Sequence, residues 1–368
     1  MQKHLRSLAR RSPHVALLLV FFLTGCATPG YYAQAVGGQI ELWRQAQPIS
    51  DMLARSDTPA PLRAKLLKVR DIRQFASREL GLPDNGSYTK YADLKRPFVT
   101  WNVFATDEFS VQPKEWCFLV VGCVSYRGYF SRDDAESYTS ELRTMGYDVY
   151  VGGVPAYSTL GYFDDPVLST FINYPETELA RLIFHELAHQ LVYAKGDSAF
   201  NESFASAVEL EGVKRWIDTH GNPADDANFA TWQGRRQDYL VLVEKYRGKL
   251  HDLYSSAASI EDKRTGKARL FREMKDDYQQ LKLTWGGFAG YDRIFSQNLN
   301  NAFIVSTALY TQLVPAFQRL LEKTGNDLPR FYEAARALAK EPREARDAAL
   351  VPLMQPGAGQ GAAAAPAR

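Results

Sequence analysis

Residues 182–190 have the sequence LIFHELAHQ, and residues 200–205 have the sequence FNESFA. The first stretch contains His-Glu-x-x-His, with His185 and His189 four positions apart. On a helix, positions i and i+4 lie on one face, so both imidazoles can point at a single metal ion. Glu186 is turned by about 100° from His185 and can reach a water molecule on that ion. The stretch therefore predicts a metal-binding helix.

A third ligand is expected from the second stretch. Catalytic zinc usually takes three protein ligands and a water molecule, and two imidazoles alone are too few. Glu202 follows His189 with twelve residues between them, and the sequence AKGDS at 194–198 is typical of a turn. A second helix can therefore fold back and bring Glu202 to the ion. Ser206 and Glu209 share a helix face with Glu202, so both are expected to hydrogen-bond to the ligands, and Glu209 is the alternative third ligand.

The metal-binding helix is expected to be buried, because apolar residues surround it on nearly all sides. These residues are Leu182, Ile183, Phe184, Leu187, Leu191 and Val192. Buried imidazoles and carboxylates are costly unless they are paired or bound to metal. A helix whose two histidines are merely hydrogen-bonded is the alternative, and the apolar surroundings favour the metal site.

The two stretches together resemble the gluzincin metallopeptidases, in which a Glu of an Asn-Glu-x-x-Ala-type segment is the third zinc ligand. The matching segments here are 185–189 and 201–205, at a shorter spacing than those peptidases usually have. The resemblance implies Zn²⁺ as the cofactor, a zincin-like fold and a peptide substrate.

The chain also resembles, over about residues 26–345, a bacterial family of predicted aminopeptidase lipoproteins. The stretches that carry this resemblance are 30–32 (GYY), 82–88 (LPDNGSY), 101–105 (WNVFA), 122–130 (GCVSYRGYF), 152–161 (GGVPAYSTLG) and 300–302 (NNA). The resemblance implies a single zincin-like catalytic domain with aminopeptidase activity.

Residues 1–25 have the composition of a targeting signal. A basic start is followed by an apolar run at 15–23, too short to span a bilayer, and then by Leu23-Thr24-Gly25-Cys26, which resembles a bacterial lipobox. Cys26 is therefore expected to be lipidated and to hold the protein on a membrane. Ala27 resembles the pattern of outer-membrane lipoproteins, which predicts a protein that faces the periplasm. An ordinary secretory signal with an incidental Cys is the alternative.

The charge balance argues against a nucleic-acid partner. The chain has 44 Lys and Arg and 42 Asp and Glu, and four of the basic residues but no acidic one lie in residues 1–25. The remainder is therefore near neutral, with a net charge of about −2, and it has no basic stripe.

Two cysteines follow Cys26 in the remaining chain. Cys117 and Cys123 are separated by five residues in an apolar segment. In an oxidising periplasm this spacing predicts a small-loop disulfide across a turn or bulge near Gly122, with two reduced core cysteines as the alternative.

The hydrophobic pattern predicts an α+β domain over residues 26–350. Strands are expected at 97–104, 117–126 and 148–157, with a helix at 133–145, and helices occupy most of the C-terminal half. The domain should contain a small sheet and the active-site helix. Residues 351–368 are rich in Gly, Ala and Pro and predict a disordered tail.

A strand directly before the metal-binding helix is a candidate for substrate binding. In zinc peptidases the edge strand beside that helix pairs with the substrate backbone, and 151–158 is our candidate for this strand. Gly152 and Gly153 would permit close approach, although a buried strand with a bulge is equally consistent with them.

These features lead to the hypothesis of zinc-dependent peptide hydrolysis. Glu186 is the expected general base, and Tyr310, on a predicted helix with Asn300 and Asn301, is the candidate for stabilising the oxyanion. A tyrosine packed in the core is the alternative for Tyr310.

Two other functions stay open. Aminopeptidases of the better-known gluzincin family carry Gly-x-Met-Glu-Asn, which this chain lacks, so an endopeptidase is the first alternative. The second is a zinc-stabilised scaffold or chaperone at the outer membrane, which would have no need for Glu186.

Overall fold

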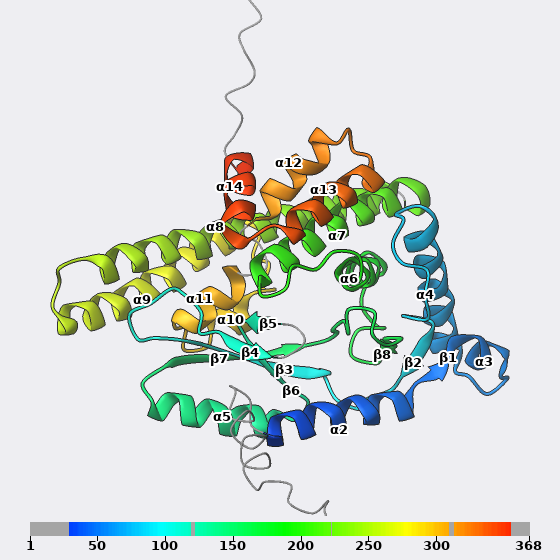
Figure 1. Cartoon of the computed structure of the whole chain (residues 1–368), viewed down its shortest axis with the longest axis horizontal. Helices are drawn as coiled ribbons and strands as arrows, with labels where there is room; N and C mark the ends of the chain where they lie inside the picture. Colours follow the sequence, from blue (N-terminus) through cyan, green and yellow to red (C-terminus); the bar gives the residue numbers. More distant parts are fainter. Residues whose placement is uncertain (1–28, 119–121, 222, 309–312, 355–368) are drawn as a thin grey trace, which may run out of the picture.

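The protein is described here from a computed structural model that covers residues 29–118, 122–221, 223–308 and 313–354 (Figure 1). Tyr310 and Cys26 lie outside the described residues, as do residues 355–368. The helices are α2 (Pro29–Gln45), α3 (Ile49–Ala54), α4 (Ala60–Arg78), α5 (Arg132–Thr144), α6 (Glu176–His189), α7 (Ser198–His220), α8 (Pro223–Ser255), α9 (Ile260–Thr284), α10 (Asp292–Phe295), α11 (Asn301–Ala308), α12 (Val314–Lys323), α13 (Leu328–Lys340) and α14 (Arg343–Met354). The strands are β1 (Gln47–Pro48), β2 (Lys90–Ala92), β3 (Thr100–Thr106), β4 (Trp116–Phe118), β5 (Gly122–Val124), β6 (Arg127–Tyr129), β7 (Asp148–Val154) and β8 (Val167–Leu168).

The larger sheet has the order β6-β3-β7, and both pairs are antiparallel. Successive residues of β3 point to opposite faces. Val103 and Ala105 pack with Leu142 of α5 on one face, and Phe104 packs with Ala302 of α11 on the other. Helices therefore cover both faces, and β7 forms an edge of the sheet.

Two smaller sheets complete the β structure. Strands β1, β2 and β8 form one, and β4 pairs with β5 in the other. The single strand expected at 117–126 is wrong, because the segment forms this β4–β5 pair, in which Cys117 lies directly opposite Cys123. Gly122, the first residue of β5, has a φ of 81°, a conformation that favours glycine. The two cysteines are joined by a disulfide.

Helices α6 and α7 lie side by side in the largest hydrophobic core, which α4, α12 and α13 also line. Helix α6 ends at His189, before Leu191 and Val192, which the sequence places on the same helix, and residues 192–194 are irregular. Gly212 of α7 faces Phe184 of α6 and Leu80, and a Cβ atom there would lie 2.7 Å from the Phe184 ring. Glycine at this position therefore permits the close approach of the two helices.

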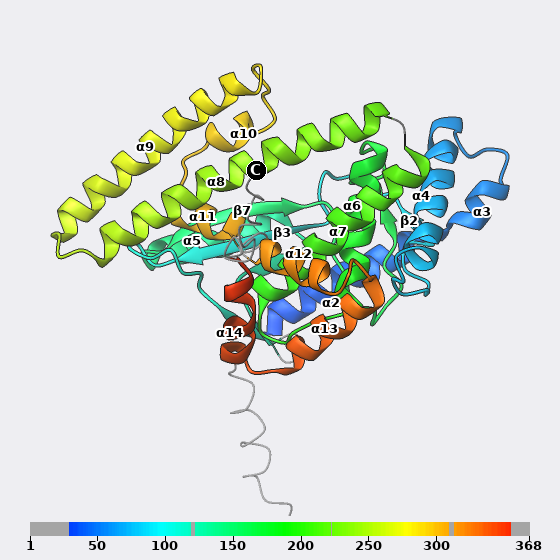
Figure 2. The ribbon, with the colours of Figure 1, turned by 90° about the horizontal axis from the view of Figure 1, so that it is seen from above.

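The C-terminal half is helical. Helices α8 and α9 form a long hairpin that projects from the rest of the protein, and α12 lies against α7, with α13 and α14 packed against α12 (Figure 2). Helix α14 extends to Met354, so residues 351–354 of the expected disordered tail are helical. Across the described ranges, none of the helices combines the length and the apolar character that crossing a membrane requires.

Candidate metal centre

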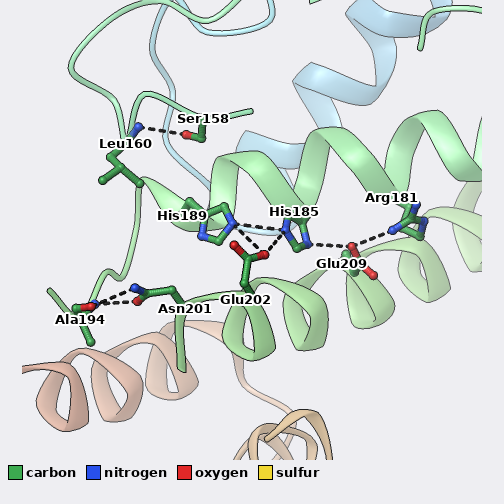
Figure 3. A network of polar contacts seen from close by, with 9 residues as sticks. All are labelled: Ser158, Leu160, Arg181, His185, His189, Ala194, Asn201, Glu202 and Glu209. Carbon is green, nitrogen blue, oxygen red and sulfur yellow. Dashed lines mark hydrogen bonds and ion pairs between the residues drawn. The ribbon is translucent and has the colours of Figure 1, made fainter. Parts of the chain in front are cut away.

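Helices α6 and α7 bring together the three side chains that the sequence suggests as metal ligands. Nε2 of His185 lies 3.2 Å from Nε2 of His189 and 3.3 Å from Oε2 of Glu202 (Figure 3). The distance from His189 Nε2 to the same carboxylate oxygen is 3.7 Å. In the described part of the chain, this trio is the group of His, Cys, Asp or Glu side chains that could hold a metal ion.

The antiparallel packing of the two helices explains this convergence. Glu202 lies near the start of α7 and faces the end of α6, whereas Glu209, two turns later, faces His185 and Arg181 (Figure 3). Glu209 is thus not at the point where both imidazoles meet. Its Oε2 lies 2.9 Å from Nδ1 of His185, a position from which it could orient that imidazole without touching an ion at Nε2.

Asn201 fixes the connection between α6 and α7. Its side-chain Oδ1 accepts a hydrogen bond from the backbone N–H of Ala194 at 2.7 Å, and its Nδ2 donates to the carbonyl of the same residue at 2.9 Å (Figure 3). Asp197 caps α7 by accepting a hydrogen bond from the N–H of Phe200. The start of α7, and with it Glu202, is therefore held by buried polar contacts.

The donor set fits a zinc ion. Ligand atoms about 2.0–2.1 Å from a tetrahedral zinc ion are about 3.3 Å apart, close to the spacing of these three atoms.

Burial raises the pKa of Glu209, but Arg181 and His185 outweigh this effect and lower it to about 2, so Glu209 is an acceptor only. Nδ1 of His185 then donates its proton to Glu209, which leaves Nε2 as the ring atom that could bind a metal ion.

The charges around His185 favour a cation at this point. Burial lowers the pKa of His185, but the carboxylates of Glu202 and Glu209 outweigh it and raise the pKa to about 10. Burial raises the pKa of Glu202, and His189 and His185 reverse this and lower it to about 2. A positive charge among these groups is therefore stabilised, as a proton or as a metal ion. Nδ1 of His189 is buried with no hydrogen-bond partner among the described residues.

The carboxyl group of Glu186 differs in its pKa from that of the candidate ligand Glu202. It is buried, and burial raises the pKa of its carboxyl group, an effect that the nearby His185 and His189 oppose. None of the three ligand atoms belongs to Glu186, so its carboxyl group stays available for proton transfer. A raised carboxyl pKa brings such a group closer to the pH range in which it can exchange protons.

Several residues of the centre are not apparent from the sequence. Arg181 lies one turn before His185 and pairs with Glu209 at 3.0 Å and with Glu178 at 3.0 Å. Burial is the main cause that raises the pKa of Tyr126 well above its ordinary value, and the negative charge of Glu202 is the second cause. The same two causes, in the same order, raise the pKa of Tyr193. The Glu202 carboxylate therefore acts electrostatically on both hydroxyl groups. The stretch at 122–130 contains Tyr126, but no spacing rule links that tyrosine to the zinc motif.

A comparison with protein families gives one match. The family described as "Putative aminopeptidase" matches residues 30–350. The chain belongs to this family. Neither the curated proteins nor the solved structures gave a match.

The family assignment spans both the sheet and the helical half, so the metal centre lies inside the matched region. The description of the family indicates a peptidase. The three converging side chains could hold a metal ion, and such an ion would be able to activate water for hydrolysis.

Proposed function

We propose that the protein is a zinc-dependent peptide hydrolase, with aminopeptidase activity as the leading specificity. The observation that carries the proposal is the convergence of His185, His189 and Glu202 at 3.2–3.7 Å, with Glu186 beside them. The family assignment supports a peptidase. A zincin-like arrangement of the fold is part of the proposal.

The residues divide the work as follows. His185, His189 and Glu202 would hold Zn²⁺, which when bound supplies a lowered pKa for water and polarises a carbonyl group. Glu186 takes a proton from the attacking water and passes it to the departing amine. Glu209 holds the imidazole of His185 in the tautomer that leaves Nε2 free to ligate.

Substrate binding is proposed at the edge of the sheet. Strand β7 pairs with β3 on one side, and the loop that follows it brings Ser158 and Leu160 near His189 (Figure 3). An extended peptide could add to the free side of β7 and continue toward the zinc site. Asn300 covers part of this side, because its Nδ2 donates to the carbonyl of Val149. The available stretch is therefore 150–154.

The hydroxyl that stabilises the oxyanion is proposed among the tyrosines. Tyr310 stays a prediction, since it lies outside the described residues. Tyr126 is the stronger candidate among the described residues, because the negative charges of Glu202 and Glu186 raise the pKa of its hydroxyl group in addition to the larger effect of burial. Lipidation at Cys26 and a location on the periplasmic side of the outer membrane complete the proposal, and the lipobox-like sequence at 23–26 supports both.

The decisive experiment compares Glu186→Gln with Glu333→Gln, whose side chain is exposed on α13. Metal content is measured together with hydrolysis of peptide pairs that differ only in a free or acetylated amino terminus. We expect Glu186→Gln to keep its zinc and to lose hydrolysis by about 10²–10⁴-fold or more, and Glu333→Gln to keep both.

The same assay separates the alternatives. Preference for free amino termini supports the aminopeptidase, and equal cleavage of acetylated peptides supports an endopeptidase. Unchanged turnover in Glu186→Gln would rule out the proposed mechanism, and zinc binding without cleavage of any peptide would favour a scaffold.

A further inference from the structure

Helix α2 is fixed against the sheet by one of its faces. Gln34 accepts a hydrogen bond from the N–H of Phe130 at 3.1 Å, and it donates to the carbonyl of Gly128 at 3.4 Å. Gly38 lies so close to the Phe130 ring that a Cβ atom would clash with it, and Leu42 is buried. These contacts on the inner face prevent the helix from turning about its axis.

The opposite face of α2 is apolar and exposed. Tyr32, Val36, Ile40 and Trp43 are 38%, 57%, 37% and 38% exposed, and their spacing of four, four and three residues keeps them on one side of the helix. An α-helix turns by about 100° per residue, so Glu41 and Arg44, the charged residues of α2, lie outside the sector of the helix that these four apolar residues occupy.

The loop after β7 extends this surface. Phe163 is 48% exposed, and the centroid of its ring lies 4.4 Å from the centroid of the Trp43 ring, with an interplanar angle of 66°. We call Tyr32, Val36, Ile40, Trp43 and Phe163 the outer apolar face. A continuous exposed apolar surface on a folded protein marks a site of interaction rather than ordinary solvent contact.

We propose that the outer apolar face rests on a lipid bilayer. Tyr and Trp are the residues that membrane–water interfaces favour, and the face presents one of each among aliphatic side chains. Helix α2 has 17 residues, a length of about 26 Å, and it carries Glu41 and Arg44, so it suits a position along the surface rather than across the membrane.

The position of Cys26 favours lipid over a second copy of the chain. Cys26 stands three residues before Pro29, the first residue of α2, and three residues span at most about 11 Å. Lipidation at Cys26 would therefore hold the start of α2 at the bilayer surface. Insertion of the outer apolar face would then add a second membrane contact to the acyl anchor.

Docking at this face also orients the metal centre. Gly161, in the loop that contains Phe163, lies against Gln190, which directly follows His189. The membrane contact and the metal-binding helix are thus joined through one short loop. Membrane docking at this face rests on the proposed lipidation of Cys26, and it goes beyond hydrolysis because it would set the angle at which the protein lies on the membrane.

The test measures the depth of Trp43 in the membrane. The lipidated full chain is placed in phosphatidylethanolamine–phosphatidylglycerol vesicles whose acyl chains carry bromine, a quencher of tryptophan fluorescence. We expect bromine to quench part of the emission of the wild-type protein, and Trp43→Phe to lose most of this quenching. Trp285→Phe, at a buried tryptophan after α9, should keep it.

Exposed apolar residues provide a second, matched comparison. Val36→Glu and Ile40→Glu should lower the quenching of Trp43, whereas Val241→Glu, 58% exposed on α8, should leave it unchanged. Because all three side chains are exposed, the fold should tolerate each change.

Three results would overturn the proposal. They are no quenching in the wild-type protein, equal quenching in Trp43→Phe, and cross-linking through Trp43 to a second copy at high lipid-to-protein ratio. The Glu186→Gln protein should be quenched like the wild type, so a failure of membrane docking is distinguishable from a failure of the proposed hydrolysis.

Discussion

Glu209 lies 2.9 Å from Nδ1 of His185 through its Oε2 atom. The same oxygen lies 3.0 Å from Nη1 of Arg181, so one carboxylate joins a candidate ligand to a buried guanidinium group. Partners of this kind orient imidazole ligands and raise their basicity. The relationship makes metal affinity depend on a residue that need not touch the metal.

Replacement of Glu209 by Gln should weaken metal binding by about 10–100-fold, since the neutral amide supports the His185 imidazole less well. Competition with a chromophoric chelator measures this affinity. Glu211→Gln is the matched control, because Glu211 is on the same helix and pairs with Arg215 instead. Equal affinities of the two variants would contradict the role assigned to Glu209.

The ion pair between Arg346 and Asp197 should be important for stability. Nη2 of Arg346 lies 2.9 Å from Oδ2 of Asp197, and both side chains are less than a tenth exposed. Arg346→Met leaves the carboxylate buried without its partner, which should cost about 3–5 kcal/mol in the free energy of unfolding. Urea denaturation measures the loss.

Arg343→Met is the control for this substitution. Arg343 is exposed and lies 3.8 Å from Glu115, so its removal should change the free energy of unfolding by less than about 1 kcal/mol. Similar losses of unfolding free energy in the two variants would mean that the buried ion pair with Asp197 stabilises the fold no more than the exposed pair does.

Reduction of the disulfide should lower stability moderately. Cys117 and Cys123 are six positions apart, and closing so small a loop stabilises the folded chain by about 2 kcal/mol through the entropy of the unfolded state. The urea midpoint is measured with and without reductant. A double Cys→Ser variant should be as unstable as the reduced protein and should not respond to reductant.

Stability should also depend on Asp165. Burial raises its pKa from 3.8 to about 7, and the nearby Glu186 adds to the increase, although hydrogen bonds from Thr159 oppose it. The folded state therefore binds this proton more tightly than the unfolded state. The stabilisation is complete below about pH 3.8 and is lost as the pH rises through about 7.

Asp165→Asn should remove this dependence. In chelator-treated protein, the variant should gain stability relative to the wild type between pH 5 and pH 8, by a few kcal/mol. Urea denaturation at both pH values tests the prediction. Asp164→Asn, at a half-exposed position paired with Lys90, should show no such gain. A constant difference between Asp165→Asn and wild type would refute the assignment.

Much of the fold follows from local pattern. The helical period places His185 and His189 on one face, and the β-branched and aromatic residues of β3 and β7 predict strands in an α+β domain. The single strand expected at 117–126 was wrong, because β-branched and aromatic composition marks strand residues without showing how many strands they form. The turn or bulge expected near Gly122 agrees with the start of β5 at that residue, where φ is 81°.

The sequence by itself determined the imidazole pair and the position of Glu186 beside it, because a turn of helix sets their spacing regardless of what surrounds them. It left two carboxylates, Glu202 and Glu209, on one face of the next helix as possible third ligands. Only the tertiary structure decided between them, since the antiparallel crossing of α6 and α7 puts Glu202 at both imidazoles and Glu209 behind His185. The partners Arg181 and Arg346 were likewise beyond the sequence, because their contacts depend on how separate helices pack rather than on any local period.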